Sequence, residues 1–328
     1  MEKQNDMLLQ VKDLRVYYTA GGEIINAVNG VDLEVRRGET LALVGETGAG
    51  KTTIAKSIMR ILPDPPAKIG GGEIYLDGQE LLHLPEKKMR EIRGKKISMI
   101  FQDPMTALNP VFTVGEQIEE VIMLHEKVNK GEAAIKARQM LELVGIPGDR
   151  SGDYPHQFSG GMKQRVVIAM ALACSPELIL ADEPTTALDV TIQAQILDMI
   201  KALKEKQNTS MILITHDLGV VAEVCDRVAV VYAGEIIECG TKEEIFDYPI
   251  HPYTVGLFGS IPKIHEDVEW LDSIPGMPPN PADLPSGCHF HPRCGKCTQP
   301  CGEKAPEMVE IRPGHFVRCL NCTEKKES

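Results

Sequence analysis

Length, composition and charge set the first limits on this chain. It has 328 residues, of which 43% are hydrophobic, and its formal net charge at pH 7 is −12; this fits one large α/β domain with a smaller appendage. The negative charge argues against a nucleic-acid-binding surface and against a polybasic membrane anchor. The start, at residues 1–6, is too polar for a secretory signal, and the longest apolar run, at 166–174, is too short to span a bilayer. We therefore expect a soluble, cytoplasmic chain that another protein holds at any membrane where it works.

The first part of the chain alternates strand-like and helix-like patterns. Residues 8–18 and 31–35 have no helix between them, which predicts an antiparallel edge layer. Short apolar runs bounded by polar or turn residues then predict strands buried on both faces, at residues 41–44, 96–100, 178–181, 211–214 and 228–231. Helical patterns follow several of these strands, at residues 52–62, 162–174 and 191–206. The alternation predicts an α/β fold around a largely parallel sheet.

Two segments depart from this alternation. Residues 116–128 and 132–144 have helical spacing with charged faces and no strand between them, which predicts an inserted helical subdomain at about 103–170. The tail is rich in Pro, Gly and Cys and has little periodicity, so we expect that a metal or a partner must hold its shape. The predicted domains are therefore 1–245, which contains the helical insertion, and 246–328.

A phosphate-binding motif follows the predicted strand at 41–44 and opens the predicted helix. Its glycines allow successive backbone N–H groups to turn toward one point, and the helix N-terminus adds its positive dipole end. Lys51 then reaches the β- and γ-phosphates, and the Thr52 hydroxyl ligates Mg²⁺. The predicted nucleotide contacts in this P-loop (RecA-like) core are Gly45, Glu46, Thr47, Gly48, Ala49, Gly50, Lys51, Thr52 and Thr53.

Two acidic residues end the predicted strand at 178–181. Asp182 lies where a P-loop ATPase places its Mg²⁺-binding carboxylate, and Glu183 is then available to orient or deprotonate the attacking water. Together with the phosphate-binding motif, these carboxylates predict ATP hydrolysis.

A second Gly-rich helix start narrows the prediction. Ser159, Gly160 and Gly161 lead directly into the predicted helix at 162–174, which makes a second anion-binding helix N-terminus. One nucleotide needs one P-loop, so this second site indicates that a neighbouring chain supplies the ATP it contacts. The stretch resembles the signature motif of ATP-binding-cassette proteins, with Phe158 for the usual leucine and Met162 for the usual glutamine.

The resemblance implies further site residues. Gln102 resembles the Q-loop glutamine, which senses Mg²⁺ and nucleotide, and His216 resembles the switch histidine at the γ-phosphate. Tyr18 resembles the aromatic residue that stacks on adenine, with Tyr17 as the alternative. Residues 187–189 resemble the D-loop, which crosses the dimer interface. The signature stretch at 158–165 argues against a plain P-loop kinase or GTPase, as does the lack of an Asn-Lys-x-Asp motif.

Six cysteines crowd into the last forty or so residues, and in a reducing cytoplasm they indicate a metal site rather than disulfides. Clustered thiolates support iron–sulfur or zinc. The paired spacings Cys294-x2-Cys297 and Cys319-x2-Cys322 keep zinc open. His289 and His291 rank below the cysteines as ligands.

The tail, together with residues 101–110 and 251–254, resembles the oligopeptide and dipeptide importer ATPases. The resemblance implies a [4Fe–4S] cluster and leaves Cys297 and Cys322 unliganded. The implied ligands are Cys288, Cys294, Cys301 and Cys319. We expect this cluster to hold the tail as a module separable from the nucleotide site.

The resemblance also implies function and partners. The expected protein binds ATP and Mg²⁺ and powers import of di- or oligopeptides from the cytoplasmic face of the cell membrane. Its expected partners are a second, related ATPase in a heterodimer, two transmembrane permease subunits and, indirectly, an extracytoplasmic peptide-binding protein. It contacts the membrane only through the permease, and no nucleic acid is expected. The alternatives are the same ATPase type for nickel import, or a non-transport cassette ATPase with a structural zinc module.

Overall fold

The computed structural model describes residues 6–185, 189–260 and 274–323. The chain divides into two compact units. The first contains Val35–Thr40 and His83–Ile214, with Asp6 and Met7. The second contains Leu8–Glu34, Leu41–Leu82 and the described residues from Thr215 onward.

Parallel strands form the core of the first unit. β6 (Ile97–Ile100), β7 (Leu178–Asp182) and β8 (Ser210–Ile214) are adjacent and parallel. Every residue of these strands is buried, as expected of a sheet covered on both faces, and this explains their nearly continuous apolar sequences. α2 (Glu86–Ile92) precedes β6, and α7 (Val190–Gln207) joins β7 to β8.

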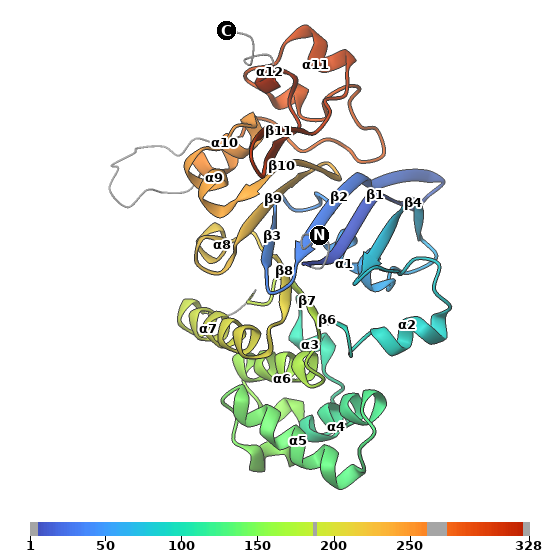
Figure 1. The fold of residues 1–328 in the computed structure, drawn as a ribbon, viewed down its shortest axis with the longest axis vertical. Coiled ribbons are helices and arrows are strands. Elements are labelled where there is room, and N and C mark those ends of the chain that lie inside the picture. The colour runs from blue at the N-terminus through green and yellow to red at the C-terminus, as the bar shows by residue number, and fades with distance from the viewer. Residues whose placement is uncertain (1–5, 186–188, 261–273, 324–328) are drawn as a thin grey trace. The chain divides into compact units, whose positions relative to one another are not determined.

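Helices fill the sequence between β6 and β7, as predicted. They are α3 (Pro104–Ala107), α4 (Val114–His125), α5 (Lys130–Leu143), two 3₁₀ turns (Gly148–Gly152 and Pro155–Gln157) and α6 (Gly160–Leu172). α4, α5 and α6 pack against one another (Figure 1). α4 and α5 each begin two residues earlier than predicted, because the side chains of Thr113 and Asn129 accept hydrogen bonds in capping boxes.

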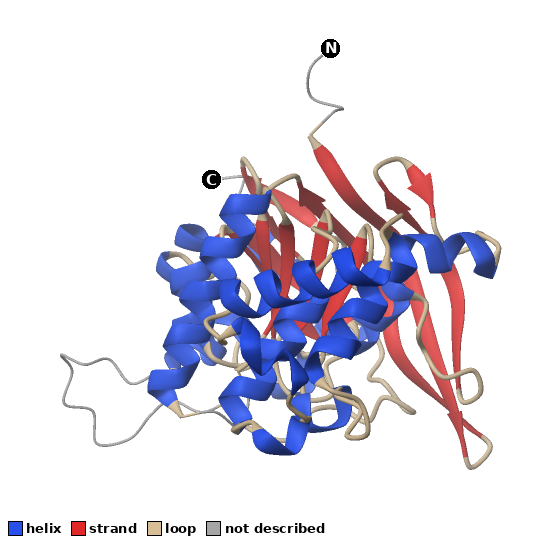
Figure 2. Ribbon diagram, turned by 90° about the horizontal axis from the view of Figure 1, so that it is seen from below, coloured by secondary structure: helices blue, strands red, loops and turns tan. Residues whose placement is uncertain are grey.

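An antiparallel sheet forms one part of the second unit. It contains β1 (Met7–Ala20), β2 (Glu23–Arg36), β4 (Ala67–Leu76) and β5 (Gln79–Glu80) in the order β2-β1-β4-β5. Figure 2 shows its long strands side by side. This sheet is the predicted edge layer, and it is larger than predicted because β4 and β5 also join it. α1 (Lys51–Met59) precedes β4, and it ends where Arg60 takes up a left-handed conformation with φ 52.

A second group of strands in this unit carries the P-loop and the tail. The strands lie in the order β11-β12-β10-β9-β3, with β3 (Thr40–Val44) parallel to β9 (Arg227–Tyr232). β10 (Glu235–Thr241), β12 (His315–Val317) and β11 (Val309–Arg312) are antiparallel to their neighbours. The helices are α8 (Leu218–Val224), α9 (Lys242–Asp247), α10 (Pro252–Gly259), the 3₁₀ turn His291–Arg293, α11 (Gln299–Glu303) and α12 (Leu320–Thr323).

The Cys-rich tail is therefore more regular than the sequence predicts. Its strand β12 pairs with β10, where Glu238 is opposite Val317 and Cys239 is opposite Phe316. These backbone pairs attach the tail to strands that continue to β3, from which the P-loop starts.

Candidate functional site

The P-loop conformation depends on glycine at its two ends. Gly45 has φ 148, and a Cβ there would lie 2.1 Å from the backbone oxygen of Val231. Gly50 has φ 105, and a Cβ there would lie 2.4 Å from the backbone oxygen of Ala27. Neither position accepts a side chain without movement of neighbouring backbone, so these glycines let the loop approach the strands closely.

Lys51 lies across this loop. It is the first residue of α1 and is 7% exposed, and its Nζ donates to the backbone oxygens of Gly45 (2.7 Å) and Glu46 (2.9 Å). Thr52 and Thr53 follow in the first turn of the helix. The glycine-bounded loop, the ammonium group and the helix N-terminus together form a cradle that suits a polyphosphate.

Of the two adjacent tyrosines, Tyr18 is the one linked to α1. Its hydroxyl lies 3.3 Å from the Thr53 Oγ1, within hydrogen-bond distance. A Cβ on Gly70 would meet the Tyr17 ring at 3.1 Å, so Tyr17 packs against β4 instead. The structure thus places the predicted adenine-stacking residue near the first turn of the P-loop helix.

In the first unit, the predicted water-activating residue is held from two sides. Glu183 has a left-handed backbone with φ 46, and its N–H donates to the backbone oxygen of Ile214 at 2.8 Å. The Gln102 Nε2 donates to the Glu183 Oε2 at 2.8 Å. Asp182, the last residue of β7, is 3% exposed. The structure therefore brings together Gln102 and Glu183, which are 81 positions apart.

The predicted signature residues form the start of α6. The Ser159 hydroxyl caps this helix by accepting from the Met162 N–H at 3.4 Å, and both Ser159 and Gly160 are exposed. Phe158 is buried, with the Arg150 guanidinium carbon 4.3 Å from its ring centroid. The apolar side chain at position 158 thus serves as an anchor, which explains why phenylalanine fits in place of leucine.

Two other predicted sites remain, together with one residue that the sequence did not predict. His216 is exposed, in the second unit, directly after β8, and Asp217 beside it caps α8. In the predicted D-loop, positions 187 and 188 lie outside the described residues. Sequence reasoning missed Gln164, which is 1% exposed and whose Nε2 donates to the Pro184 backbone oxygen at 2.6 Å. It links α6 to the turn that follows Glu183.

The cysteines predicted as cluster ligands are neighbours in the second unit. The pKa of the Cys288 thiol is raised to about 11, mainly by burial and also by the nearby thiols of Cys319, Cys301 and Cys294. Burial likewise raises the pKa of Cys294. A hydrogen bond with Cys322 lowers the pKa of Cys319 to about 6, which favours its thiolate. Among the described residues, none of these cysteines forms a disulfide.

The described residues do not form a preformed metal centre. Within residues 6–185, 189–260 and 274–323, no three His, Cys, Asp or Glu side chains converge closely enough to hold a metal ion. The predicted metal-cluster extension is thus a folded segment with neighbouring thiols. Thiols are suitable ligands for a thiolate-bound metal, but in the described part of the tail they are not arranged around one point.

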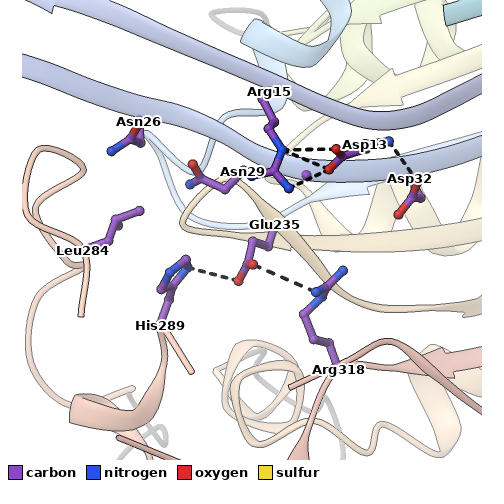
Figure 3. Close-up of a pocket in the computed structure, with 10 residues that line it drawn as sticks. Asp13, Arg15, Asn26, Asn29, Asp32, Glu235, Leu284, His289 and Arg318 are labelled. Carbon is purple, nitrogen blue, oxygen red and sulfur yellow. Dashed lines mark hydrogen bonds and ion pairs between the residues drawn. The ribbon is translucent and has the colours of Figure 1, made fainter. Parts of the chain in front are cut away.

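A polar cavity of about 530 Å³ also lies in the second unit, and Figure 3 shows its lining. Two close side-chain pairs line it: the Arg15 Nη2 lies 2.8 Å from the Asp13 Oδ1, and the His289 Nδ1 lies 3.0 Å from the Glu235 Oε2. None of the predicted nucleotide residues or cysteine ligands lines it, although His289, a lower-ranked candidate ligand, does. We assign it no part in the predicted chemistry.

Comparison with known families matches two regions. Residues 28–186 match the family described as ABC transporter, and residues 237–301 match the family described as oligopeptide/dipeptide transporter, C-terminal region. No helix in the described part of the chain is both long and apolar enough to cross a membrane.

Named relatives match nearly the whole chain. The oligopeptide transport ATP-binding protein OppD of Bacillus subtilis is 52% identical over 95% of this chain and 88% of its own. The dipeptide transport ATP-binding protein DppD of the same organism is 50% identical over 96% and 94%. OppD of Escherichia coli is 47% identical over 99% and 96%.

Solved structures agree with the fold. The ATP-binding cassette MJ0796, solved as a dimer in a post-hydrolysis state bound to ADP and Pi, matches with a TM-score of 0.65 and 30% identity, over 71% of this chain and 98% of its own. The cbiO1 protein from Clostridium perfringens, part of the cbiONQ transporter complex, matches with a TM-score of 0.63 and 28% identity, over 77% and 95%.

Proposed function

We propose that this chain hydrolyses ATP to power the import of di- or oligopeptides through a membrane permease. The chain belongs to the ABC transporter ATPases with an oligopeptide/dipeptide C-terminal region. The observation that carries the proposal is that a P-loop and this C-terminal region lie in one chain that is about half identical to peptide transport ATP-binding proteins over 95% of its length. We assign the nucleotide-binding domain to residues 1–245, with the helical subdomain at about 103–170, and the extension to 246–328.

The phosphates of ATP would lie in the P-loop cradle, at residues 45–53, with Lys51 turned from the loop oxygens toward the β- and γ-phosphates. The adenine would stack on Tyr18. Thr52, Asp182 and Gln102 would hold Mg²⁺, whose charge neutralises the phosphate oxygens as the transferring group develops negative charge. The tight fit of Gly45 and Gly50 against neighbouring backbone supports this assignment.

For hydrolysis, Glu183 would accept a proton from the attacking water while His216 contacts the γ-phosphate. The hydrogen bond from Gln102 holds the Glu183 carboxylate in one orientation, so a change at Gln102 would be transmitted to the base. Most of the acceleration would come from positioning and charge neutralisation, because phosphoryl transfer needs little covalent help.

The exposed start of α6 suits contact with a second cassette. Ser159, Gly160 and Gly161 would donate to the ATP held by the partner, so that two chains close around each nucleotide. We propose that the partner is a related ATPase in a heterodimer and that the pair works on the cytoplasmic face of the membrane. Two permease subunits would hold it there, and an extracytoplasmic peptide-binding protein would deliver the cargo.

For the tail, we propose a [4Fe–4S] cluster held by Cys288, Cys294, Cys301 and Cys319, with Zn²⁺ as the alternative. The proximity of these four thiols supports the proposal, because those of Cys294, Cys301 and Cys319 all act electrostatically on Cys288. Anaerobic purification followed by iron, sulfide and zinc analysis tests it. The proposal expects about four irons per chain and a brown protein; one zinc and no iron would replace the cluster with a zinc site.

A transport assay tests which cargo this ATPase moves. The chain, its partner ATPase and the permease pair are reconstituted in proteoliposomes with the binding protein, and ATP-dependent uptake of a labelled dipeptide is compared with uptake of labelled nickel. We expect peptide uptake that stops in E183Q. Uptake of nickel alone would keep the ATPase and change the cargo, and ATP hydrolysis with neither cargo transported would favour the non-transport alternative.

A further inference from the structure

Arg293 of the Cys-rich tail forms an ion pair with the P-loop. This arginine is 247 positions from Glu46, the second residue of the P-loop motif. Its Nη1 donates to the Glu46 Oε2 at 2.8 Å, and its Nη2 donates to the Oε1 at 3.0 Å. The pair is bidentate, and the arginine side chain is only 6% exposed, so this contact is stronger and more directional than a surface ion pair.

Arg293 is itself held by contacts with the tail and with Tyr232 of β9. Its Nε donates to the backbone oxygen of Pro275 at 2.9 Å, and its Nη1 also donates to the Tyr232 hydroxyl at 3.3 Å. Tyr232 and Phe290 pack against each other with ring centroids 5.2 Å apart. These contacts fix the guanidinium plane before it meets the carboxylate, so little side-chain entropy is lost on pairing.

A second tail residue holds the backbone of the same P-loop position. The Tyr253 hydroxyl accepts the Glu46 N–H at 2.9 Å. Tyr253 is fully buried in α10, and its ring centroid lies 4.6 Å from that of Tyr232 and 5.5 Å from that of Phe290. One aromatic cluster therefore supports both groups that reach Glu46.

The carboxylate, the backbone N–H and the backbone oxygen of Glu46 all form hydrogen bonds. Arg293 binds its carboxylate, Tyr253 accepts its N–H, and the Lys51 Nζ donates to its backbone oxygen at 2.9 Å. The first two partners come from the C-terminal part of the chain, and the third is the phosphate-binding lysine. A shift of the tail would move Glu46 and, through it, the loop backbone beneath Lys51.

We infer that Arg293 and Tyr253 are positioning residues of the nucleotide site, which hold Glu46 so that the P-loop keeps its phosphate-binding shape. The affinity of this chain for MgATP therefore depends on the fold of its C-terminal extension. The inference rests on the proposed ATP binding, and it replaces the expectation of two separable modules.

The test uses the full-length chain and a fluorescent ATP analogue with Mg²⁺. R293Q removes the fork and the charge, and Y253F removes the hydroxyl but keeps the ring in the cluster. We expect binding to weaken roughly tenfold in R293Q and roughly threefold in Y253F, in line with the loss of charge-assisted and neutral hydrogen bonds. The matched control is R312Q, because Arg312 is an exposed tail arginine on β11; its binding should equal that of the wild type.

A double-mutant cycle separates a specific contact from general loosening of the tail. If Arg293 acts through Glu46, then E46Q, R293Q and the double variant bind MgATP with similar, weakened affinity. In the assembled transporter, KM for MgATP should rise in R293Q while kcat changes little, which a loss of folded protein would not produce. Additive losses in the cycle would overturn the inference.

The remaining outcomes separate this inference from the proposed function. A wild-type chain that does not bind MgATP would refute the proposed function itself. A wild-type chain that binds MgATP, together with R293Q and Y253F variants that bind it equally well, would refute only the positioning role. If R293Q does not fold, the MgATP affinity of Y253F tests the inference, because that variant keeps the aromatic ring in its cluster and loses only the hydroxyl.

Discussion

At the residue scale, the hydrogen bonds around Glu183 fix its carboxylate before the chemical step. The backbone at Glu183 has φ 46, its N–H is held by Ile214, and its Oε2 accepts from Gln102. A non-glycine residue in the left-handed region is uncommon and is found where surrounding contacts fix it. The strand end thus delivers a carboxylate in one orientation, as a proposed general base requires.

Replacing this carboxylate by an amide should separate binding from hydrolysis. In E183Q, kcat for ATP hydrolysis should fall roughly 10²- to 10⁴-fold, because a positioned base is lost, while MgATP binding is kept. The control is E177Q, since Glu177 pairs with Arg37 and Lys96 at the other end of β7. Hydrolysis by E183Q at the wild-type rate would assign the base to another residue.

The P-loop glycines predict unequal effects of alanine. G45A should abolish detectable MgATP binding, because its Cβ would lie 2.1 Å from a backbone oxygen. G48A should weaken binding less, because Gly48 has φ 83 but no atom within 4 Å of its would-be Cβ, so only backbone strain opposes it. Titration with a fluorescent nucleotide measures both, and equal losses would contradict the steric explanation.

At the element scale, the sequence predicts the strongly apolar strands and the long helices. It misses the short strands of the tail and the Gly-rich β4. β7 and β8 differ from prediction by one residue because both faces are buried and the sequence is apolar throughout. β11 and β12 have four and three residues and lie in a Pro-, Gly- and Cys-rich segment. β12 pairs with β10, and β11 pairs with β12. These pairings come from tertiary contact, which local periodicity does not encode.

The start of α10 predicts acid sensitivity. His251 is 1% exposed, and its Nδ1 accepts the Tyr253 N–H at 3.0 Å, so the ring must be neutral there. Burial lowers the pKa of His251 to about 4, although the nearby Glu238 carboxylate raises it. An unfolded histidine titrates near about 6.5. The folded state therefore binds fewer protons, and the free energy of unfolding should fall as the pH drops from about 6.5 to about 4.

Substitution tests this assignment. H251N keeps a side-chain acceptor for the helix cap but does not titrate, so the difference in unfolding free energy between pH 7.5 and pH 5 should shrink relative to the wild type. Urea unfolding of the full chain measures it, with H156N at an exposed position as the control. Unchanged pH dependence in H251N would assign the sensitivity to other groups.

At the scale of the whole molecule, the order of motifs along the chain predicted the family, and the comparisons confirm it. Each motif lies within a short stretch of the chain, so it can be recognised from a single sequence. The contact between Arg293 and Glu46 spans 247 positions and involves no recognisable motif at Arg293. No local pattern predicts this contact, because its two residues lie far apart in the sequence.

Assembly gives a prediction at the same scale. S159R places a long charged side chain at the exposed start of α6, so the chain should bind its own MgATP normally but fail to associate with its partner cassette when ATP is added. The control is I135R, at a 60% exposed position on α5. Light scattering of mixed subunits with and without ATP measures the association. Normal association by S159R would contradict the proposed role of the signature residues.

Whether this ATPase powers peptide import is decided by the ATP hydrolysis rate of the reconstituted transporter with and without peptide-loaded binding protein. We expect peptide-loaded binding protein to raise the rate in the wild type and to leave it near zero in E183Q. A wild-type rate that does not respond to peptide, or that responds to nickel instead, would contradict the claim that this ATPase powers peptide import.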